Sequence, residues 1–507
     1  EKTTAEKIRE FSERKNRIGA MGGEKMVRKQ HEQGKLTARE RLDLLFDQGT
    51  FQEIQLFVKH RSTLFGLAEK EINADGVITG FGRINGRVVF VAAQDFTSAG
   101  GSLGEMHAQK ICKAMDMAVE ARKPFIALND SGGARIQEGI TALQGYAGIF
   151  YRNSIASGYI PQISAIMGPT AGGAVYSPAL TDWVFMVKNN SYMYITGPDV
   201  VKAVIAEEVS HEELGGAMAH AAKSGVCHFV TENDAECIAG VKTMLSYLPD
   251  SCHSPQPVAP CTDSADRECP ELDTVIPDKA SRAYDMKKII AAVADNHEMF
   301  EPHEYWAKNM VVAFIRVMGR PVGVIANNPR FGAGVLDVNA SDKAARFIRF
   351  CDAFNIPLLT FTDLPGYMPG TQQEWSGIIR HGAKLLHAYS EATVTKISVV
   401  VRKAYGGGYI AMCAKGLGAD YVMAWPSAEI AVMGAEGACN VIYRREISGA
   451  DDPAAKRTEL AASYEAQFNN PYFAASLGIV DEIILPRETR KRVAAVLDAF
   501  QDKSETR

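Results

Sequence analysis

The sequence lacks the features that would place it outside the soluble globular enzymes. Its 507 residues contain no run of about 18 uninterrupted apolar residues, so no membrane-spanning helix is expected. An excess of one charge is also missing, because the net charge is −5 and the isoelectric point is near 6.2, which gives no general attraction for nucleic acid. The opening residues, Glu1 to Thr4, have no signal-peptide character. We therefore predict a cytoplasmic protein that neither inserts into a membrane nor binds nucleic acid.

Motifs of several common enzyme classes are missing too. The chain has no GxSxG nucleophile elbow, no HExxH zinc motif, no P-loop and no dinucleotide fingerprint. Serine acyl transfer, zinc hydrolysis and nucleotide hydrolysis therefore lack their usual residues. The nine cysteines are scattered along the chain, which favours reduced thiols over a disulfide framework. One polar segment gathers cysteines without CxxC spacing, so no metal site is predicted there; its residues are Cys252, His253, Cys261 and Cys269.

A long internal repeat is the most informative feature that the chain does have. Gly86-Arg87 recurs 233 residues later as Gly319-Arg320. The same offset relates Gly101 to Gly334, Lys110 to Lys343, Pro124 to Pro357 and Asp130 to Asp363, and an offset of 234 relates Gly172-Gly173 to Gly406-Gly407. So many matches in register predict two copies of one fold.

Each copy alternates short apolar runs with helical patterns, which predicts parallel buried strands joined by crossover helices. The predicted strands are 87–93, 124–129, 162–167, 321–326, 357–362 and 396–401, and the predicted helices are 105–122 and 341–354. Between the copies the sequence is polar and rich in proline, as in a linker. We therefore predict an N-terminal domain over 1–250, a linker over 251–283 and a C-terminal domain over 284–507.

Glycine-rich segments follow the predicted strands, at the sheet edge where ligands of open α/β folds bind. They are Asp130-Ser131-Gly132-Gly133-Ala134-Arg135 and Gly172-Gly173 in the first copy, and Asp363-Leu364-Pro365-Gly366-Tyr367 and Gly406-Gly407-Gly408-Tyr409 in the second. Glycine lets the backbone approach a ligand and point N–H groups at it, which suits the enolate chemistry of a thioester. Tight turns and close packing explain glycine pairs equally well, so the residues alone leave both interpretations open.

Long motifs in a fixed order resemble the carboxyltransferase subunits of the propionyl-CoA carboxylase β, methylmalonyl-CoA decarboxylase α and transcarboxylase family. They cover nearly the whole chain and include GKLTARERL at 34–42, DSGGARIQE at 130–138, SPALTD at 177–182, NASDKA at 339–344, IRHGAK at 379–384 and EIAVMG at 429–434. The resemblance implies an α/β fold of two tandem crotonase (ClpP)-like domains related by internal duplication. In that family the N-terminal domain binds acyl-CoA and the C-terminal domain binds biotin.

The family's functional residues can be carried over by motif. Gly172 and Gly173 would hold the thioester oxygen of the acyl-CoA, and Gly407 and Gly408 the ureido oxygen of biotin. Further substrate-binding residues implied by the resemblance are Gly132, Gly133, Ala134, Arg135, Tyr176, Gly366, Tyr409 and Ile410. The implied reaction moves a carboxyl group between biotin and a short acyl-CoA, methylmalonyl-CoA or propionyl-CoA, through an enolate. The resemblance places the active sites between neighbouring subunits of a homohexamer.

Two details concern the substrate and the partners. Relatives that carboxylate propionyl-CoA often have an acidic residue after the tyrosine that follows the second glycine pair, whereas this chain has Ile410, as in the decarboxylase and transcarboxylase branch. A biotin acceptor needs a lysine between methionines, but the nearest segment has Asp116 between Met115 and Met117. Biotin is therefore expected on another polypeptide, and the predicted partners are a biotin carrier protein and further subunits of a complex.

Several alternatives stay open. A crotonase-type hydratase or isomerase would need a glutamate base, for which Glu138 and Glu374 are the candidates, and a non-catalytic subunit would only dock a biotin carrier. The basic residues Arg28, Lys29, Lys35, Arg39 and Arg41 either meet CoA phosphates or lie on a solvated helix that begins with a Thr37 and Glu40 capping box. Arg135 is either an ion-pair partner of Glu138 or Asp130 or part of the pocket wall.

Overall fold

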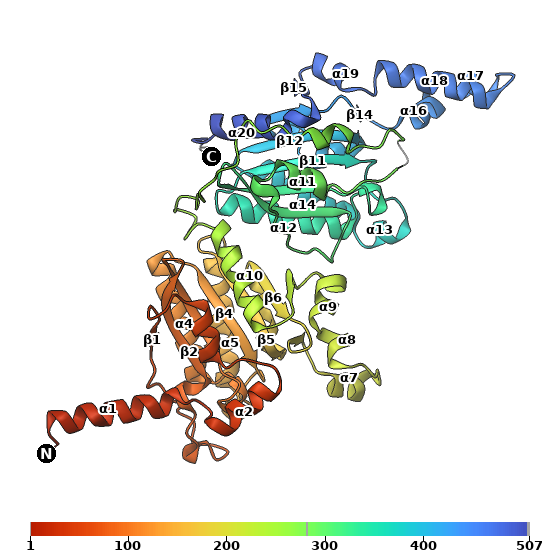
Figure 1. The fold of residues 1–507 in the computed structure, drawn as a ribbon. Helices are drawn as coiled ribbons and strands as arrows, with labels where there is room; N and C mark the ends of the chain where they lie inside the picture. The colour runs from red at the N-terminus through yellow and green to blue at the C-terminus, as the bar shows by residue number, and fades with distance from the viewer. Residues whose placement is uncertain (1, 280–281, 504–507) are drawn as a thin grey trace. The chain divides into compact units, whose positions relative to one another are not determined.

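The computed structural model describes residues 2–279 and 282–503, which form two compact units, Glu1–Pro255 (unit 1) and Gln256–Arg507 (unit 2) (Figure 1). Three short stretches lie outside the described residues. They are residue 1 of the predicted N-terminal domain, residues 280 and 281 of the predicted linker, and residues 504–507 of the predicted C-terminal domain. No helix of the described segments is long and apolar enough to cross a bilayer. All nine cysteines are free thiols.

Unit 1 is built on an eight-stranded sheet in the order β1-β2-β3-β4-β5-β6-β8, with β7 paired to β5. The strands from β3 onward are parallel, and β1 and β2 form an antiparallel edge. The strand bounds are β1 Gln52–Ile54, β2 Val77–Ile84, β3 Arg87–Gln94, β4 Phe125–Ser131, β5 Gln162–Ala171, β6 Trp183–Val187, β7 Tyr192–Tyr194 and β8 Phe229–Thr231. The parallel strands therefore end at one edge of the sheet.

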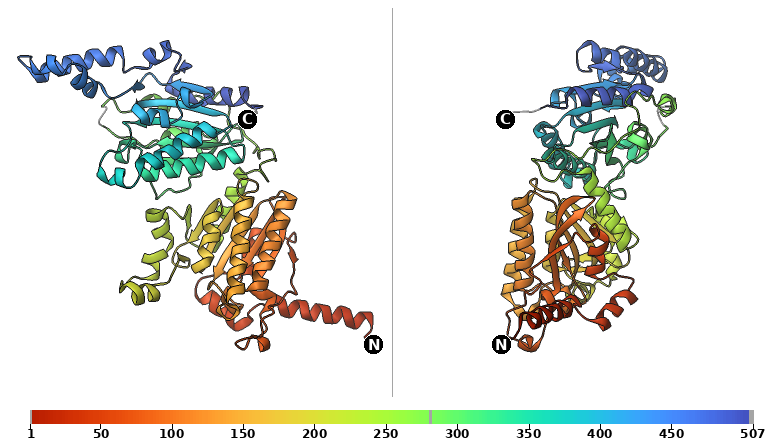
Figure 2. Two further views of the ribbon diagram at one scale, coloured as in Figure 1. Left: turned by 180° about the vertical axis from the view of Figure 1, so that it is seen from behind. Right: turned by 60° about the vertical axis from the view of Figure 1, so that its left-hand side comes forward.

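Helices cover both faces of this sheet (Figure 2). Helices α4 (Glu105–Ala121) and α5 (Ile140–Ala156) pack on one face, and α3 (Ala38–Leu45) and α10 (Asp234–Tyr247) on the other. Helix α1 (Thr4–Gly19) extends away from the unit and has no buried residue (Figure 1). The remaining α-helices of unit 1 are α2 Glu24–Glu32, α6 Tyr176–Leu180, α7 Pro198–Ile205, α8 His211–Gly215 and α9 Ala217–Ala219.

Unit 2 repeats this plan with a seven-stranded sheet in the order β15-β13-β12-β11-β10-β9, with β14 paired to β12. Its strands are β9 Met310–Val317, β10 Arg320–Asn327, β11 Leu358–Leu364, β12 Lys396–Tyr405, β13 Tyr421–Ala424, β14 Glu429–Ala431 and β15 Glu482–Ile483. Its helices are α11 Lys287–Val293, α12 Val338–Ala353, α13 Thr371–Trp375, α14 Ile378–Glu391, α15 Gly406–Ala411, α16 Ala435–Ile442, α17 Arg444–Ser448, α18 Pro453–Gln467, α19 Pro471–Ser476 and α20 Thr489–Ala499.

The internal repeat is present in the structure residue by residue. Ser131 of β4 pairs with Thr170 of β5, and the corresponding Leu364 of β11 pairs with Ala404 of β12. An isolated bridge joins Leu103 to Ala134 in unit 1 and Leu336 to Tyr367 in unit 2, again 233 residues apart. The glycine-rich segments of the two copies therefore occupy equivalent places in equivalent sheets.

The predicted linker differs from the structure. Cys269 and Leu272 are buried in the core of unit 2 among residues of β9, β10 and α20, and the N–H of Cys269 donates to the carbonyl oxygen of Arg487 (2.8 Å). The compact units divide at Pro255 and Gln256. A few apolar residues at the right positions are thus enough to hold this polar segment against unit 2.

Because the imidazole of His107 in α4 is buried, we predict that the stability of the protein depends on pH. The side chain of His107 is fully buried, its Nδ1–H donates to the carbonyl oxygen of Asp75 (2.8 Å), and its Nε2 accepts from Gln94 Nε2 (3.3 Å). Burial, followed by the nearby Arg135, lowers the pKa of His107 well below its usual value. Below about pH 6.5 the unfolded chain therefore binds a proton that the folded chain does not. The free energy of unfolding then decreases as the pH is lowered, by up to about 1.4 kcal/mol per pH unit.

Urea unfolding between pH 7.5 and 5 measures this effect. We expect His107→Gln to lose this part of the pH dependence, whereas the control His387→Gln, at a largely exposed side chain, keeps it. An unchanged pH dependence in His107→Gln would show that the buried imidazole does not couple to folding.

Candidate active site

The turn after β5 presents backbone N–H donors. Gly172 has a φ of +62°, a conformation that suits glycine, and begins a short 3₁₀ turn, Gly172–Val175. A Cβ added to Gly173 would lie 3.1 Å from the ring of Tyr146, so this ring packs directly against the turn. Gly173 lies in the first turn of this segment, where a backbone N–H has no partner within the helix.

The turn after β12 has the same form. Gly406 has a φ of +58° and corresponds to Gly172. A Cβ added to Gly407 would meet no atom within 4 Å, whereas one added to Gly408 would lie 2.7 Å from Leu364 Cδ1 and 3.0 Å from Gly366 Cα. Gly407 and Gly408 likewise lie in the first turn of α15, whose N–H groups have no partner within the helix.

The repeat refines how the two turns compare. Gly407 corresponds to Gly173, and Gly408 corresponds to Ala174. The residue pairs predicted from the family motif, Gly172 with Gly173 and Gly407 with Gly408, are therefore not equivalent, because the second pair begins one residue later than the first. Gly173 and Gly407 are the equivalent members of these pairs, and each lies in the first turn of a short helix. They are therefore the candidate oxygen-binding residues of the two turns.

A second loop lies beside each turn. Gly133 has a φ of +93°, and a Cβ there would lie 3.1 Å from the carbonyl oxygen of Ala171 at the end of β5. The N–H of Gly132 donates to Gly100 O (2.9 Å) and that of Gly133 to Ser131 Oγ (3.1 Å). The N–H of Ala134 has no partner among the described residues, so it is the free donor of the three predicted loop residues. The N–H of Tyr367, which corresponds to Ala134 and follows Gly366 (φ +139°), also has no partner among the described residues.

The guanidinium group of Arg135 binds carboxylates of the protein itself. Arg135 is 3% exposed, and its Nη1 pairs with Asp75 Oδ1 (2.5 Å) and Glu138 Oε1 (2.7 Å). The predicted pairing with Glu138 is confirmed, while Asp75 takes the place of Asp130. These contacts favour a structural role that holds the 132–134 loop, and direct binding of substrate by Arg135 stays a prediction.

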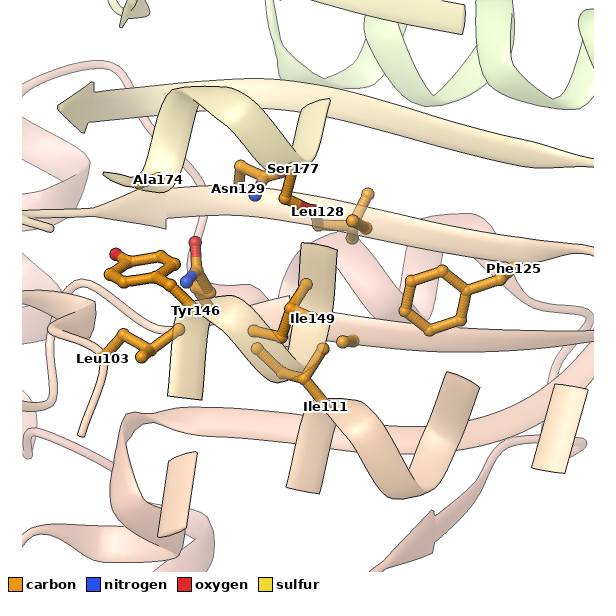
Figure 3. Close-up of a pocket in the computed structure, with 12 residues that line it drawn as sticks. Leu103, Ile111, Phe125, Leu128, Asn129, Tyr146, Ile149, Ala174 and Ser177 are labelled. Atoms are coloured by element: carbon orange, nitrogen blue, oxygen red, sulfur yellow. The ribbon is translucent and has the colours of Figure 1, made fainter. Parts of the chain in front are cut away.

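A small cavity of about 30 Å³ lies beneath the turn after β5 (Figure 3). Its wall includes Ala174 of the turn, Tyr146, Asn129 and Ser177. The hydroxyl of Tyr146 and Oδ1 of Asn129 are buried without a hydrogen-bond partner in the described residues, and the volume suits an ordered water molecule. Tyr146 is a contact of the site that no sequence motif indicated.

The predicted substrate-binding side chains on the short helices lie at equivalent positions. Tyr176 of α6 corresponds to Ile410 of α15, and the two are 49% and 48% exposed. Tyr409 precedes Ile410, and its hydroxyl is buried without a partner in the described segments, as is that of Tyr367. Burial raises the pKa of each of these two phenols to about 12. Both are therefore neutral hydrogen-bond donors at neutral pH.

The two candidate glutamate bases lie in different surroundings. The buried Glu138 carboxylate accepts from the N–H of Glu105 (2.7 Å) and pairs with Arg135. Glu374 lies exposed on α13. The structure therefore offers no observation in favour of a glutamate-dependent hydratase.

The basic N-terminal segment corrects a sequence-based expectation. The capping box of Thr37 and Glu40 is confirmed, but Lys35 and Arg41 are 4% and 1% exposed and form ion pairs with Asp130. They can neither face solvent nor meet a CoA phosphate. Their burial could not be inferred from sequence because the carboxylate that holds them lies more than 85 positions away along the chain.

The candidate site therefore comprises first-turn backbone N–H groups at two equivalent strand ends. No group of three His, Cys, Asp or Glu side chains in residues 2–279 and 282–503 could hold a metal. N–H groups of this kind stabilise a negative oxygen that develops during a reaction. The arrangement can bind and polarise carbonyl-type oxygens, one at each strand end.

Comparisons with known proteins point to one family. The model of the carboxyl transferase domain family matches residues 29–507. Methylmalonyl-CoA decarboxylase subunit alpha of Propionigenium modestum is 52% identical over 99% of this chain and 97% of its own length. The human mitochondrial propionyl-CoA carboxylase beta chain is 53% identical over 98% of this chain and 92% of its own. Transcarboxylase 12S, whose hexamer structure was solved with methylmalonyl-coenzyme A bound, covers 100% of this chain and 97% of its own with a TM-score of 0.98 and 51% identity.

Proposed function

The chain belongs to the carboxyl transferase family, and on that premise we propose that it moves a carboxyl group between carrier-bound biotin and methylmalonyl-CoA or propionyl-CoA. Family membership confirms the predicted resemblance, the predicted fold class and the predicted reaction class, biotin-dependent carboxyl transfer on an acyl-CoA. The identity of the acyl group and the roles of individual residues belong to the proposal.

One observation carries the proposal on residue roles. Gly173 and Gly407, at equivalent positions of the two copies, each lie in the first turn of a short helix, where the N–H has no partner within the helix. Such first-turn N–H groups are available to an oxygen of a bound ligand. Gly173 would bind the thioester oxygen of the acyl-CoA, and Gly407 the ureido oxygen of biotin.

The surrounding residues have supporting roles in this proposal. Ala134 adds a donor beside Gly173, and an enolate oxygen accepts more strongly from these N–H groups than a neutral thioester does, which lowers the barrier. Tyr367 is the counterpart of Ala134 in unit 2. Ile410 and Tyr176, exposed on the short helices, would limit the size of the acyl group. The side chain of Ile410 favours the decarboxylase and transcarboxylase type of substrate.

Biotin fits the donors of unit 2. The first-turn N–H groups of Gly407 and Gly408 match a ureido oxygen, and the exposed face of Gly407 leaves space for a ring. When bound, biotin supplies the nitrogen that carries the carboxyl group and the base that the protein's own side chains do not provide. We further propose a cytoplasmic homohexamer, as in transcarboxylase 12S, with a biotin carrier protein and other subunits as partners.

Decarboxylation with free biotin tests the proposed function. The purified chain is incubated with free biotin and, in turn, methylmalonyl-CoA, malonyl-CoA and glutaconyl-CoA, and product CoA esters are followed by chromatography. We expect decarboxylation that requires biotin and is fastest with methylmalonyl-CoA. Hydration of crotonyl-CoA without biotin would support a hydratase instead, and inactivity in every assay would indicate a docking subunit.

A further inference from the structure

A buried aspartate stands directly before the predicted oxygen-binding loop in each unit. Asp130 is the penultimate residue of β4 and Asp363 that of β11, and both are at most 1% exposed. The register between these strands and the next shifts at each aspartate, between Asn129 and Ser131 in unit 1 and between Thr362 and Leu364 in unit 2. Such bulges redirect the chain that follows. The two carboxylates therefore lie where the loops of the site begin.

The two carboxylates are bound by cations that come from non-equivalent positions in the two units. In unit 2, Arg402 of β12 donates Nε to Asp363 Oδ2 (3.0 Å). The corresponding residue of unit 1 is Gly168, where an added Cβ would overlap the Asp130 carboxylate. The charge there comes instead from Lys35, whose Nζ donates to Asp130 Oδ1 (2.7 Å), and from Arg41, whose Nη1 donates to Oδ2 (2.8 Å). A buried cation therefore binds the aspartate in both units, although it comes from non-equivalent positions of the two copies.

Arg41 also joins the two strands that carry the site. Its Nη1 binds Asp130 of β4, its Nη2 donates to the carbonyl oxygen of Met167 in β5 (3.0 Å), and its Nε donates to Asp234 of α10 (2.7 Å). The planar fork of arginine fixes all three directions at once, which an ammonium group cannot do. One guanidinium therefore sets the separation of β4 and β5 shortly before the loop of Ala134 and the turn of Gly173.

We propose that Arg41 and Lys35 are positioning residues of the acyl-CoA half of the site. They hold the Asp130 bulge and the end of β5 so that the N–H groups of Ala134 and Gly173 converge on one oxygen. This inference rests on the proposed function. The chemical reason is geometric, because catalytic donors must be held to within about 0.5 Å and a displacement of about 1 Å can cost about 100-fold in rate.

A buried lysine of the same unit provides a matched control. Lys110 of α4 is 1% exposed, and its Nζ donates to the carbonyl oxygens of Ala74 (2.7 Å) and Val77 (2.5 Å). It contacts neither β4 nor the turn after β5 in these bonds. Lys110→Met therefore removes a buried cation of equal burial without releasing the strand ends of the site.

The experiment compares Arg41→Lys, Lys35→Met and Lys110→Met in the full-length assembled protein. For each, kcat and KM are measured for methylmalonyl-CoA with free biotin, and kcat is expressed per folded enzyme from circular dichroism. We expect kcat to fall at least about 10-fold in Arg41→Lys and Lys35→Met with KM for biotin unchanged, while Lys110→Met keeps the wild-type kcat.

Three results decide the inference. A wild-type kcat in Arg41→Lys, or an equal loss in Lys110→Met, would overturn it. If Arg41→Lys does not assemble, Lys35→Met, which removes a single contact to Asp130, decides alone, and an unchanged kcat again overturns the inference. Failure of the proposed function is distinct, because the wild-type protein itself would then be inactive in the same assay.

Discussion

Replacing Gly407 with valine is expected to lower the rate of carboxyl transfer at least about 100-fold without lowering stability. The loss of one preorganised oxygen-binding donor typically costs about 100- to 1,000-fold in rate. A Cβ at this position meets no protein atom within 4 Å, and the backbone is outside the left-handed region, so the side chain fits the fold. It projects instead into the open space through which a ligand oxygen must reach the Gly407 N–H.

Gly416→Val is the matched control for this substitution. Gly416 is an exposed glycine of unit 2 whose added Cβ also meets nothing within 4 Å, but it lies outside the strand-end turns. We expect the control to keep the wild-type rate with methylmalonyl-CoA and free biotin, and both variants to show the wild-type melting temperature. More than about a tenth of the wild-type rate in Gly407→Val would contradict the role assigned to this turn.

Replacing Gly168 with alanine is expected to destabilise unit 1 by about 3 kcal/mol or more. The added Cβ would overlap the Asp130 carboxylate and lie 2.8 Å from Lys35 Nζ, in a cluster whose members are almost wholly buried. Relief of the overlap requires breaking a buried ion pair, which costs about 3 to 5 kcal/mol. Urea unfolding of the full chain, monitored by circular dichroism, measures the change.

Gly148→Ala provides the comparison within the same unit. A Cβ there would make ordinary contacts, 3.5 Å from Cys112 Sγ and 3.7 Å from Arg152 Nη1, in the interior of α5. Because alanine favours helix over glycine by about 1 kcal/mol, this variant should be as stable as the wild type or more so. Equal stability of Gly168→Ala and the wild type would mean that the Asp130 cluster is looser than its contacts indicate.

Much of the fold could be predicted from the sequence because the chain contains it twice. The six predicted strands all exist, and their starts agree with β3, β4, β5, β10, β11 and β12 to within a residue. The duplicated glycine pairs marked the strand ends, since a positive φ such as that of Gly172 and Gly406 restricts the residue type at both copies. Local rules also sufficed for the Thr37 and Glu40 capping box.

Residues whose role depends on distant partners could not be predicted. Lys35 and Arg41 look like surface charges until Asp130 and Asp234 are brought to them by the fold. Tyr146 reaches Gly173 only because α5 packs across the sheet, and no pattern along the chain records that contact. The polar composition of the linker likewise concealed Leu272, one of the apolar residues whose burial holds this segment against unit 2.

The central claim is that equivalent backbone amides, Gly173 in one unit and Gly407 in the other, each bind one ligand oxygen. A crystal structure of the assembled protein with propionyl-CoA and biotin tests it most directly. We predict the thioester oxygen within about 3.2 Å of the Gly173 nitrogen and the ureido oxygen within the same distance of the Gly407 nitrogen. Ligand oxygens held by side chains elsewhere, with both amides facing bulk water, would contradict it.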